Sequence, residues 1–434
     1  MKRDVDQKLL EWKDKINKKC LLIDGARQVG KTYSIRKFGK ESYRDFVEIN
    51  LIDDTDAQTL FQTAKSSQDI LMYLSIIAGK SLTKNNTLIF FDEVQVCPNL
   101  ITLVKFLVED GQYDYILSGS LLGIELISTA SIPVGYMEII QMYPMTFKEF
   151  AIANGVSQQI FDYLKQCFIE YTPVNEAIHS RLIDLFHLYI IVGGMPAAVA
   201  QYIHTNDLTK VIQEQQNIIQ LYKLDISKYD PKNKLYITDI YDRIPSELAE
   251  QNKRFEVNSI KYGLKFDRVK NGFLWLTNAG VAHSVFCANE PTFPLMLSKS
   301  RNLLKLFLSD IGLLTSCYAN NIQLKLLRKD VDINYGGIYE NAVAQEMITN
   351  GLNLYYYKNN RIGEIDLLCE IDGEVVPIEV KSGKSYKKHS ALNHLLNTYH
   401  YSKAYTLSNY NLSVEDNKIY QKKELNEGNK TKTD

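Results

Sequence analysis

Short runs of apolar residues alternate with segments of helical periodicity through the first third of the chain. The apolar runs predict strands at Cys20–Ile23, Asp45–Asn50, Thr87–Phe91, Tyr115–Leu117 and Tyr136–Gln141. One apolar stripe predicts a helix within Asp4–Lys19, and it is formed by Leu9, Leu10, Trp12 and Ile16. A second predicted helix, before the third strand, holds Leu71, Tyr73, Leu74 and Ile77. This alternation predicts an α/β fold whose parallel sheet is covered by helices.

The pattern changes twice after the predicted sheet. From Tyr143 it is helical, with a first boundary near Pro144–Gly155 and a predicted turn at Ile191–Ala198 (IVGGMPAA). Pro245–Phe286 predicts helices that end in a short strand, and from Tyr335 one helix, three strands, a basic helix and a last strand follow. We therefore expect domains at 1–150, 151–334 and 335–420, and a mobile polar tail at 421–434.

Composition narrows the class of protein. The chain has 434 residues, 45% of them hydrophobic and 23% charged, which is typical of globular proteins. The formal net charge of -1 provides no general attraction to nucleic acid, so any such contact must be local. The six cysteines lack metal-ligand or disulfide spacing and are expected to be free thiols. The best membrane candidate, Leu188–Ala200, is too short to span, so we expect a cytoplasmic protein without a membrane partner.

A phosphate-binding loop is indicated directly after the first predicted strand. The residues are Gly25, Ala26, Arg27, Gln28, Val29, Gly30, Lys31 and Thr32, which fit G-x-x-x-x-G-K-[ST]. Glycines permit a turn whose N–H groups converge on phosphate oxygens, and the following helix N-terminus favours negative charge. Lys31 would neutralise the β and γ phosphates, and the Thr32 hydroxyl would bind Mg²⁺. The loop therefore predicts a binding site for a nucleoside triphosphate, most simply ATP with Mg²⁺.

Two carboxylates follow the buried run Leu88–Phe91. Ligands of parallel sheets bind where strands end, so Asp92 and Glu93 are expected to face the nucleotide. Asp92 is suited to bind Mg²⁺, and Glu93 to orient and deprotonate the attacking water.

The third candidate at this edge is the serine pair Ser118 and Ser120, which follows the next predicted strand. Either serine could sense the γ phosphate or hold the water, and Ser118 is the preferred catalytic candidate. The alternative is that these serines only cap the next helix or turn.

Together these motifs resemble AAA-type ATPases of bacteria and archaea that carry a long carboxy-terminal region of unknown function. The resemblance extends through MYPMTFKEF, IVGGMPAA, RIPSEL, FLWLTNAGV, SDIGLL and GIYENAVAQE. It implies an AAA-type sheet, a helical middle region with a winged-helix-like unit, and a restriction-endonuclease-like carboxy-terminal domain. Many relatives carry Arg after the Gly that precedes the fifth strand, whereas Gly135 is followed here by Tyr136. An arginine finger would then come from a neighbouring subunit, and no residue is assigned to it.

A second cluster lies near the carboxy-terminal end. Asp366 and Glu379-Val380-Lys381 lie on adjacent predicted strands, and Glu340 lies on the helix before them. Glu379 and Lys381 share one face of their strand, because successive side chains point oppositely. The pattern resembles the PD-(D/E)xK nuclease signature. Asp366 and Glu379 would hold a second Mg²⁺ or Mn²⁺, Glu340 would complete the shell, and Lys381 would polarise the water.

Function remains open between two classes at this stage. The first is an ATPase that couples nucleotide state to a nuclease-like domain acting on DNA. The second is a nucleotide-dependent switch or scaffold that binds a protein partner or assembles as a homo-oligomer, with a catalytically silent nuclease-like domain whose charges pair with one another. DNA contacts are expected, if anywhere, at Lys384, Lys387 and Lys388, or in a basic stretch formed by Lys253, Arg254, Lys261, Lys265, Arg268 and Lys270.

Overall fold

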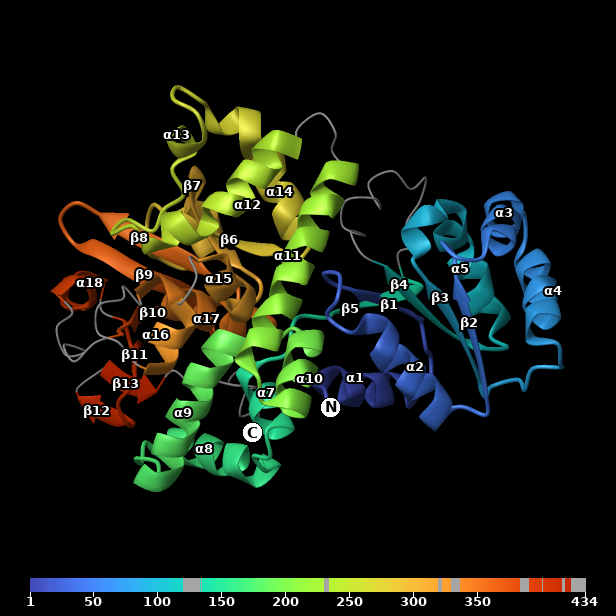
Figure 1. The fold of residues 1–434 in the computed structure, drawn as a ribbon, viewed down its shortest axis with the longest axis horizontal. Helices are drawn as coiled ribbons and strands as arrows, with labels where there is room; N and C mark the ends of the chain where they lie inside the picture. The colour runs from blue at the N-terminus through green and yellow to red at the C-terminus, as the bar shows by residue number, and fades with distance from the viewer. Residues whose placement is uncertain are drawn as a thin grey trace. The chain divides into compact units, whose positions relative to one another are not determined.

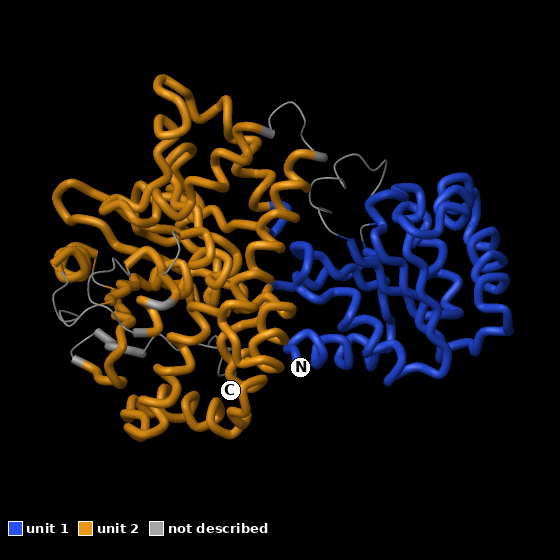
Figure 2. The backbone as a smooth tube through the Cα atoms, viewed as in Figure 1, with its two compact units in different colours: residues 1–143, 278–280 blue, residues 144–277, 281–434 orange. Residues whose placement is uncertain are grey.

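The computed structural model describes residues 1–119, 133, 135–229, 234–318, 322–328, 336–382, 390–399, 401–415 and 418–422. The chain forms two compact units (Figure 2). Unit 1 comprises Met1–Tyr143 and Asn278–Gly280, and unit 2 comprises Pro144–Thr277 and Val281–Asp434.

Unit 1 is built on a five-stranded sheet with the order β2-β3-β4-β1-β5. The strands are β1 (Cys20–Asp24), β2 (Asp45–Asn50), β3 (Thr87–Asp92), β4 (Asp114–Gly119) and β5 (Met137–Gln141). Every neighbouring pair is parallel, which confirms the sheet expected from the apolar runs. The helices are α1 (Asp4–Lys13), α2 (Lys31–Ser42), α3 (Thr55–Thr63), α4 (Ser67–Ala78), the 3-10 helix η1 (Val94–Val96) and α5 (Pro98–Asp110).

Both faces of this sheet are covered by helices (Figure 1). On β3, Ile89 and Phe91 face a core that includes Phe61 of α3 and Leu74 of α4, and the intervening Phe90 is equally buried on the other face. Burial on both faces explains why these strands are continuous apolar runs. Of the residues expected to line α4, Ile77 is instead 36% exposed, because the helix buries the stripe through Ile70 and Leu74.

Unit 2 contains an eight-stranded mixed sheet with the order β12-β13-β11-β10-β9-β8-β6-β7. Its strands are β6 (Ala282–Ala288), β7 (Lys299–Leu308), β8 (Tyr355–Asn359), β9 (Gly363–Ile371), β10 (Glu374–Val380), β11 (Ala404–Ser408), β12 (Ser413–Glu415) and β13 (Lys418–Lys422). β6 and β7 precede the boundary expected at 334/335, and the others follow it. The sheet therefore joins two regions that the sequence pattern separates.

The helices of unit 2 lie partly between the two sheets in sequence and partly among the strands of this second sheet. They are α7 (Phe147–Ala153), α8 (Gln158–Glu170), α9 (Glu176–Val192), α10 (Pro196–Thr205), α11 (Leu208–Tyr229), α12 (Lys234–Ala249), α13 (Val257–Ile260), α14 (Phe266–Asn278), α15 (Ile311–Cys317), α16 (Ile322–Arg328), α17 (Gly336–Thr349) and α18 (Ser390–Tyr399), with the 3-10 helix η3 (Leu295–Ser298). No single helix in the described ranges is long and apolar enough to cross a membrane, and only the bent pair α9 and α10 passes that test together.

Several motifs that are distant in sequence meet in a buried polar junction of unit 2. The Gly194 N–H donates to Asp310 Oδ2 at 2.6 Å, and a Cβ at Gly194 would lie 2.0 Å from the Met145 carbonyl oxygen. Glu346 Oε1 accepts from the Phe147 N–H at 2.7 Å and from the Tyr189 hydroxyl at 2.9 Å. The motifs MYPMTFKEF, IVGGMPAA, SDIGLL and GIYENAVAQE thus share a structural role, because buried polar groups require partners.

Candidate functional site

The loop Gly25–Gly30 connects β1 to the N-terminus of α2. Gly30 is the N-cap of α2 with φ 94°, a left-handed conformation that glycine adopts without strain. At Gly25 a Cβ would lie 2.1 Å from the Met142 carbonyl oxygen, so only glycine fits. The two glycines of the predicted motif are therefore required by backbone geometry, and the helix N-terminus is placed to receive an anion.

Lys31 is folded back over the loop. It is 9% exposed, and its Nζ donates to the carbonyl oxygens of Gly25 at 2.7 Å and Ala26 at 2.8 Å. Burial lowers the pKa of Lys31 to about 8, although the charges of Glu93, Asp24 and Asp92 act in the opposite direction. Among the described residues its hydrogen-bond partners are carbonyl oxygens, and a phosphate would neutralise this buried ammonium better.

Thr32 and Asp92, the two residues expected to bind Mg²⁺, are in contact. The Thr32 hydroxyl donates to Asp92 Oδ2 at 2.9 Å, and the Ser118 hydroxyl donates to Asp92 Oδ1. Asp92 is 4% exposed and Ser118 is fully buried. Hydroxyl and carboxylate oxygens are ligands that Mg²⁺ prefers, so the pair from α2 and β3 fits this ion. Ser118 is hydrogen-bonded to the Asp92 carboxylate in this arrangement. Ser120 lies outside the described residues.

Glu93 directly follows β3 in an unusual backbone conformation. Its φ of 58° and ψ of 44° are left-handed, which is uncommon for a residue other than glycine. Such strain persists where the surroundings hold the residue in place and is frequent at functional sites. The Gln95 carboxamide donates to Glu93 Oε2 and fixes the carboxylate.

Three residues near the loop escaped the sequence-based prediction. Asp24, the last residue of β1, accepts from the Gly25 N–H at 2.8 Å, and burial raises its pKa. Its position at a strand end is the same signal that selected Asp92. The Arg3 guanidinium donates to the Val29 carbonyl oxygen at 3.0 Å, and no sequence pattern indicates this long-range contact. Gln95 is the third, and it lies two positions after Glu93.

Tyr136 occupies the position where the resemblance implied an arginine. It precedes Met137, which pairs with Cys20 at the start of β1, whereas the phosphate loop follows the end of that strand. Four strand residues separate the two edges by about 13 Å. An arginine at this position would therefore lie at the opposite end of β1 from the phosphate loop of its own chain. The Tyr136 hydroxyl instead donates to Glu109 Oε1 at 2.7 Å.

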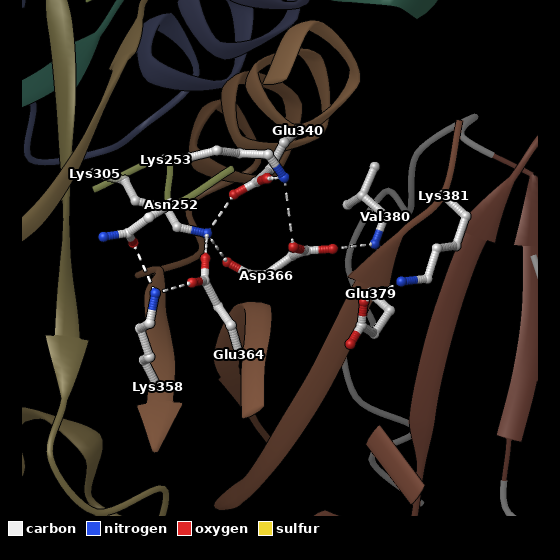
Figure 3. Close-up of polar contacts among 10 residues, drawn as sticks. All are labelled: Asn252, Lys253, Lys305, Glu340, Lys358, Glu364, Asp366, Glu379, Val380 and Lys381. Carbon is white, nitrogen blue, oxygen red and sulfur yellow. Dashed lines mark hydrogen bonds and ion pairs between the residues drawn. The ribbon is translucent and has the colours of Figure 1, made fainter. Parts of the chain in front are cut away.

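The carboxy-terminal carboxylates form a network with lysines in unit 2 (Figure 3). Glu340 is fully buried, and its two oxygens accept from Lys253 and from Lys305 Nζ, the latter at 2.6 Å. Lys305 is also fully buried and lies 2.9 Å from Glu364 Oε1. Burial disfavours the charged form of Lys305, but the charges of Glu340 and Glu364 outweigh it and raise its pKa. Both oxygens of Glu340 are thus paired with lysines.

Asp366 lies on β9, Glu379 on β10, and Lys381 directly follows β10. Asp366 Oδ2 accepts from the Val380 N–H at 2.8 Å, and Lys381 Nζ donates to Glu379 Oε2 at 2.9 Å. Burial raises the pKa of Glu379, and the Asp366 carboxylate adds to this rise. Within the described part of the chain, no group of three or more His, Cys, Asp or Glu is arranged to hold a metal ion.

The basic stretch divides into paired and exposed residues. Lys253 pairs with Glu340, and Arg254 pairs with Glu256. The others are exposed, namely Lys261, Lys265, Arg268 and Lys270. Lys384, Lys387 and Lys388 lie outside the described residues.

A parallel sheet, a glycine loop leading into a helix and a hydroxyl-carboxylate pair at the strand ends define the class of P-loop nucleotide-binding domains. Residues 17–151 match a family model described as AAA domain. Unit 1 is therefore an AAA-type P-loop domain. Residues 183–325 and 335–425 match two further models, Domain of unknown function (DUF8612) and Domain of unknown function (DUF4143).

Similarity to several solved structures was also found. A variant of RuvB from Thermotoga maritima is 15% identical with a TM-score of 0.29, covering 64% of this chain and 88% of that chain. Drosophila ORC bound to DNA is 13% identical with a TM-score of 0.29, covering 74% and 93%. Domain III of the replication initiation protein DnaA from Thermotoga maritima is 16% identical with a TM-score of 0.25, covering 48% and 88%. No curated protein matches the chain.

Proposed function

We propose that this protein is a Mg²⁺-dependent ATP hydrolase whose catalytic site lies at the carboxyl ends of β1, β3 and β4. The observation that carries the proposal is the meeting of Thr32 and Asp92, 2.9 Å apart, beside a phosphate loop closed by Lys31. These are the groups that positioning and charge neutralisation of a triphosphate require.

Each residue then has a role toward the substrate. The loop N–H groups and Lys31 bind the phosphates, while Thr32 and Asp92 would hold Mg²⁺, which neutralises phosphate oxygens when bound. Glu93 accepts a proton from the attacking water. At the same time the water oxygen forms a bond to the γ-phosphorus, and the bond between the γ-phosphorus and the oxygen that bridges to the β-phosphate breaks. The products are ADP, phosphate and the proton, which Glu93 returns to solvent.

Calorimetry with ATP and GTP in the presence of Mg²⁺ tests binding, and phosphate release with and without DNA tests turnover. Heat with ATP and phosphate release that requires Mg²⁺ are the expected results. Absence of heat with both nucleotides would remove the proposal.

Nucleotide binding is expected to take up protons near pH 8. Lys31 has a pKa of about 8 in the free protein, so a fraction of it is neutral at that pH. The phosphates favour the charged form, so binding raises this pKa and affinity falls as pH increases through 8. Calorimetry in two buffers of different ionisation enthalpy measures the uptake. Binding that shows no buffer dependence at pH 8 would contradict the role of Lys31.

For unit 2 we propose a binding or docking module with a catalytically silent nuclease-like cluster. The order α17, β8, β9, β10, α18 and β11 supports the restriction-endonuclease-like fold expected from the resemblance. Three helices, α12 to α14, followed by the antiparallel pair β6 and β7, support a winged-helix-like unit. The pairing of Glu340 with two lysines favours a nuclease-like cluster without catalytic activity, because the Glu340 carboxylate is already neutralised. DNA remains the candidate partner of the exposed basic residues on and before α14.

Replacing Lys305 with methionine is expected to destabilise unit 2 strongly. The substitution leaves Glu340 buried with one partner fewer, and breaking a buried ion pair costs roughly 3–5 kcal/mol. Lys358→Met is the matched control, because Lys358 is 40% exposed and bonds Glu364 at 3.0 Å, so its loss costs less than about 1 kcal/mol. Urea unfolding of the full chain measures both. Equally small changes in the free energy of unfolding of the two variants would show that the network does not stabilise unit 2.

Cleavage is tested separately with plasmid and branched DNA in Mg²⁺ or Mn²⁺. If the nuclease-like cluster is catalytically silent, the wild-type chain will cleave DNA no more than the Glu379→Ala, Lys381→Ala double variant does. Cleavage by the wild-type chain that the double variant lacks would instead establish the metal-dependent nuclease. Phosphate release that DNA stimulates, and that neutralising Lys265 and Arg268 abolishes, would support a DNA-linked ATPase over a protein-linked switch.

A further inference from the structure

The Gln95 carboxamide is buried beside Glu93, and only its nitrogen end makes a hydrogen bond within the described part of the chain. The side chain is 5% exposed, and its Nε2 donates to Glu93 Oε2. Its Oε1 is buried and has no hydrogen-bond partner within the described part of the chain. A buried acceptor without a partner is costly and is found where a ligand or water completes it.

The local backbone brings this carboxamide to the carboxylate. Glu93 is left-handed at the start of η1, and the turn carries Gln95 back toward it. The two ends of a carboxamide are roughly 2.2 Å apart, as its bond lengths require. Oε1 therefore lies within the reach of a single water molecule from the Glu93 carboxylate.

We propose that Gln95 is a positioning residue for hydrolysis, which orients Glu93 through Nε2 and accepts the second hydrogen of the attacking water at Oε1. This inference rests on the proposed ATPase function. The water then donates one hydrogen to each side chain, which fixes its lone pair toward the γ-phosphorus. As the oxygen–phosphorus bond forms, Glu93 takes one proton, the other stays on the phosphate product, and the electron pair of the broken bond leaves on ADP.

Replacing Gln95 with methionine keeps the length of the side chain and removes both polar ends. We expect kcat to fall about ten- to a hundredfold, the scale of a misplaced reacting group, while KM and the calorimetric affinity for ATP stay within twofold. A Gln95→Glu variant keeps the shape and an acceptor but loses the N–H donor, so kcat falls in it too. It also provides a second measurement if the methionine variant does not fold.

The matched control is Gln58→Met. Gln58 Nε2 donates to the Val96 carbonyl oxygen at 3.2 Å, so it supports the same turn without touching Glu93. This control is expected to keep the wild-type kcat. An equal loss of kcat in Gln58→Met would overturn the inference, because it would trace the effect to the stability of η1.

A double-variant cycle separates this inference from the proposed function. In the Glu93→Gln background, Gln95→Met is expected to cause a smaller further loss of kcat than it causes in the wild type, because its action through Glu93 is already lost. Independent, multiplying losses, or full activity of Gln95→Met alone, would overturn the role of Gln95 and leave the ATPase intact. Wild-type turnover by the Glu93→Gln variant alone would instead contradict the proposed catalytic role of Glu93, on which the inference about Gln95 rests.

Discussion

Replacing Lys31 with alanine is expected to abolish ATP turnover, with a loss of at least roughly 10²–10³-fold in kcat. The ammonium lies on the carbonyl oxygens at the start of the loop, 2.7 Å from that of Gly25 and 2.8 Å from that of Ala26. Without it, the negative charge that develops on the phosphates loses the ammonium that the loop carries. Phosphate release under saturating ATP and Mg²⁺ measures the effect.

The matched control for this prediction is Lys40→Ala. Lys40 is exposed on the same helix, α2, so the substitution changes the net charge equally and leaves the loop untouched. Its turnover is expected to stay at the wild-type level. Turnover by Lys31→Ala within a few fold of this control would contradict the assignment of the phosphate loop.

The nucleotide site was largely predictable because its determinants are local. Glycine at positions 25 and 30 and the apolar run of β3 are readable in a few residues each. Parallel strands align their carboxyl ends, so groups that follow β1 and β3 lie at the same edge of the sheet, where Thr32 and Asp92 meet. The strained Glu93 and the contact of Gln95 with it depend on the path of one turn, which no periodicity encodes.

The second unit was less predictable because its determinants are long-range. β6 and β7 join a sheet whose other strands lie after residue 354, and pairing across such a distance leaves no local signal. Glu340 resembles a metal ligand in sequence, yet its partners Lys253 and Lys305 lie 87 and 35 positions away. An acidic residue near an E-x-K pattern does not reveal whether a metal or a lysine will neutralise it.

Replacing Glu93 with glutamine is expected to separate binding from hydrolysis. Glutamine has nearly the same shape but cannot take a proton from water, so kcat falls by roughly 10²–10⁴-fold, the range of a lost general base. Lys31, Thr32 and Asp92 remain in place, so calorimetric affinity for ATP with Mg²⁺ stays close to that of the wild type. Nucleotide recovered from the variant after gel filtration is expected to be ATP rather than ADP.

Glu48→Gln provides the control for this prediction. Glu48 lies on β2, next to β3, and pairs at 2.6 Å with Arg36, whose side chain is 51% exposed. Removing a carboxylate there changes the net charge of unit 1 by the same amount without altering the strand end that holds Asp92. If both variants keep turnover, Glu93 is not the base. If both lose it together with ATP affinity, the effect comes from charge at this edge rather than from proton transfer.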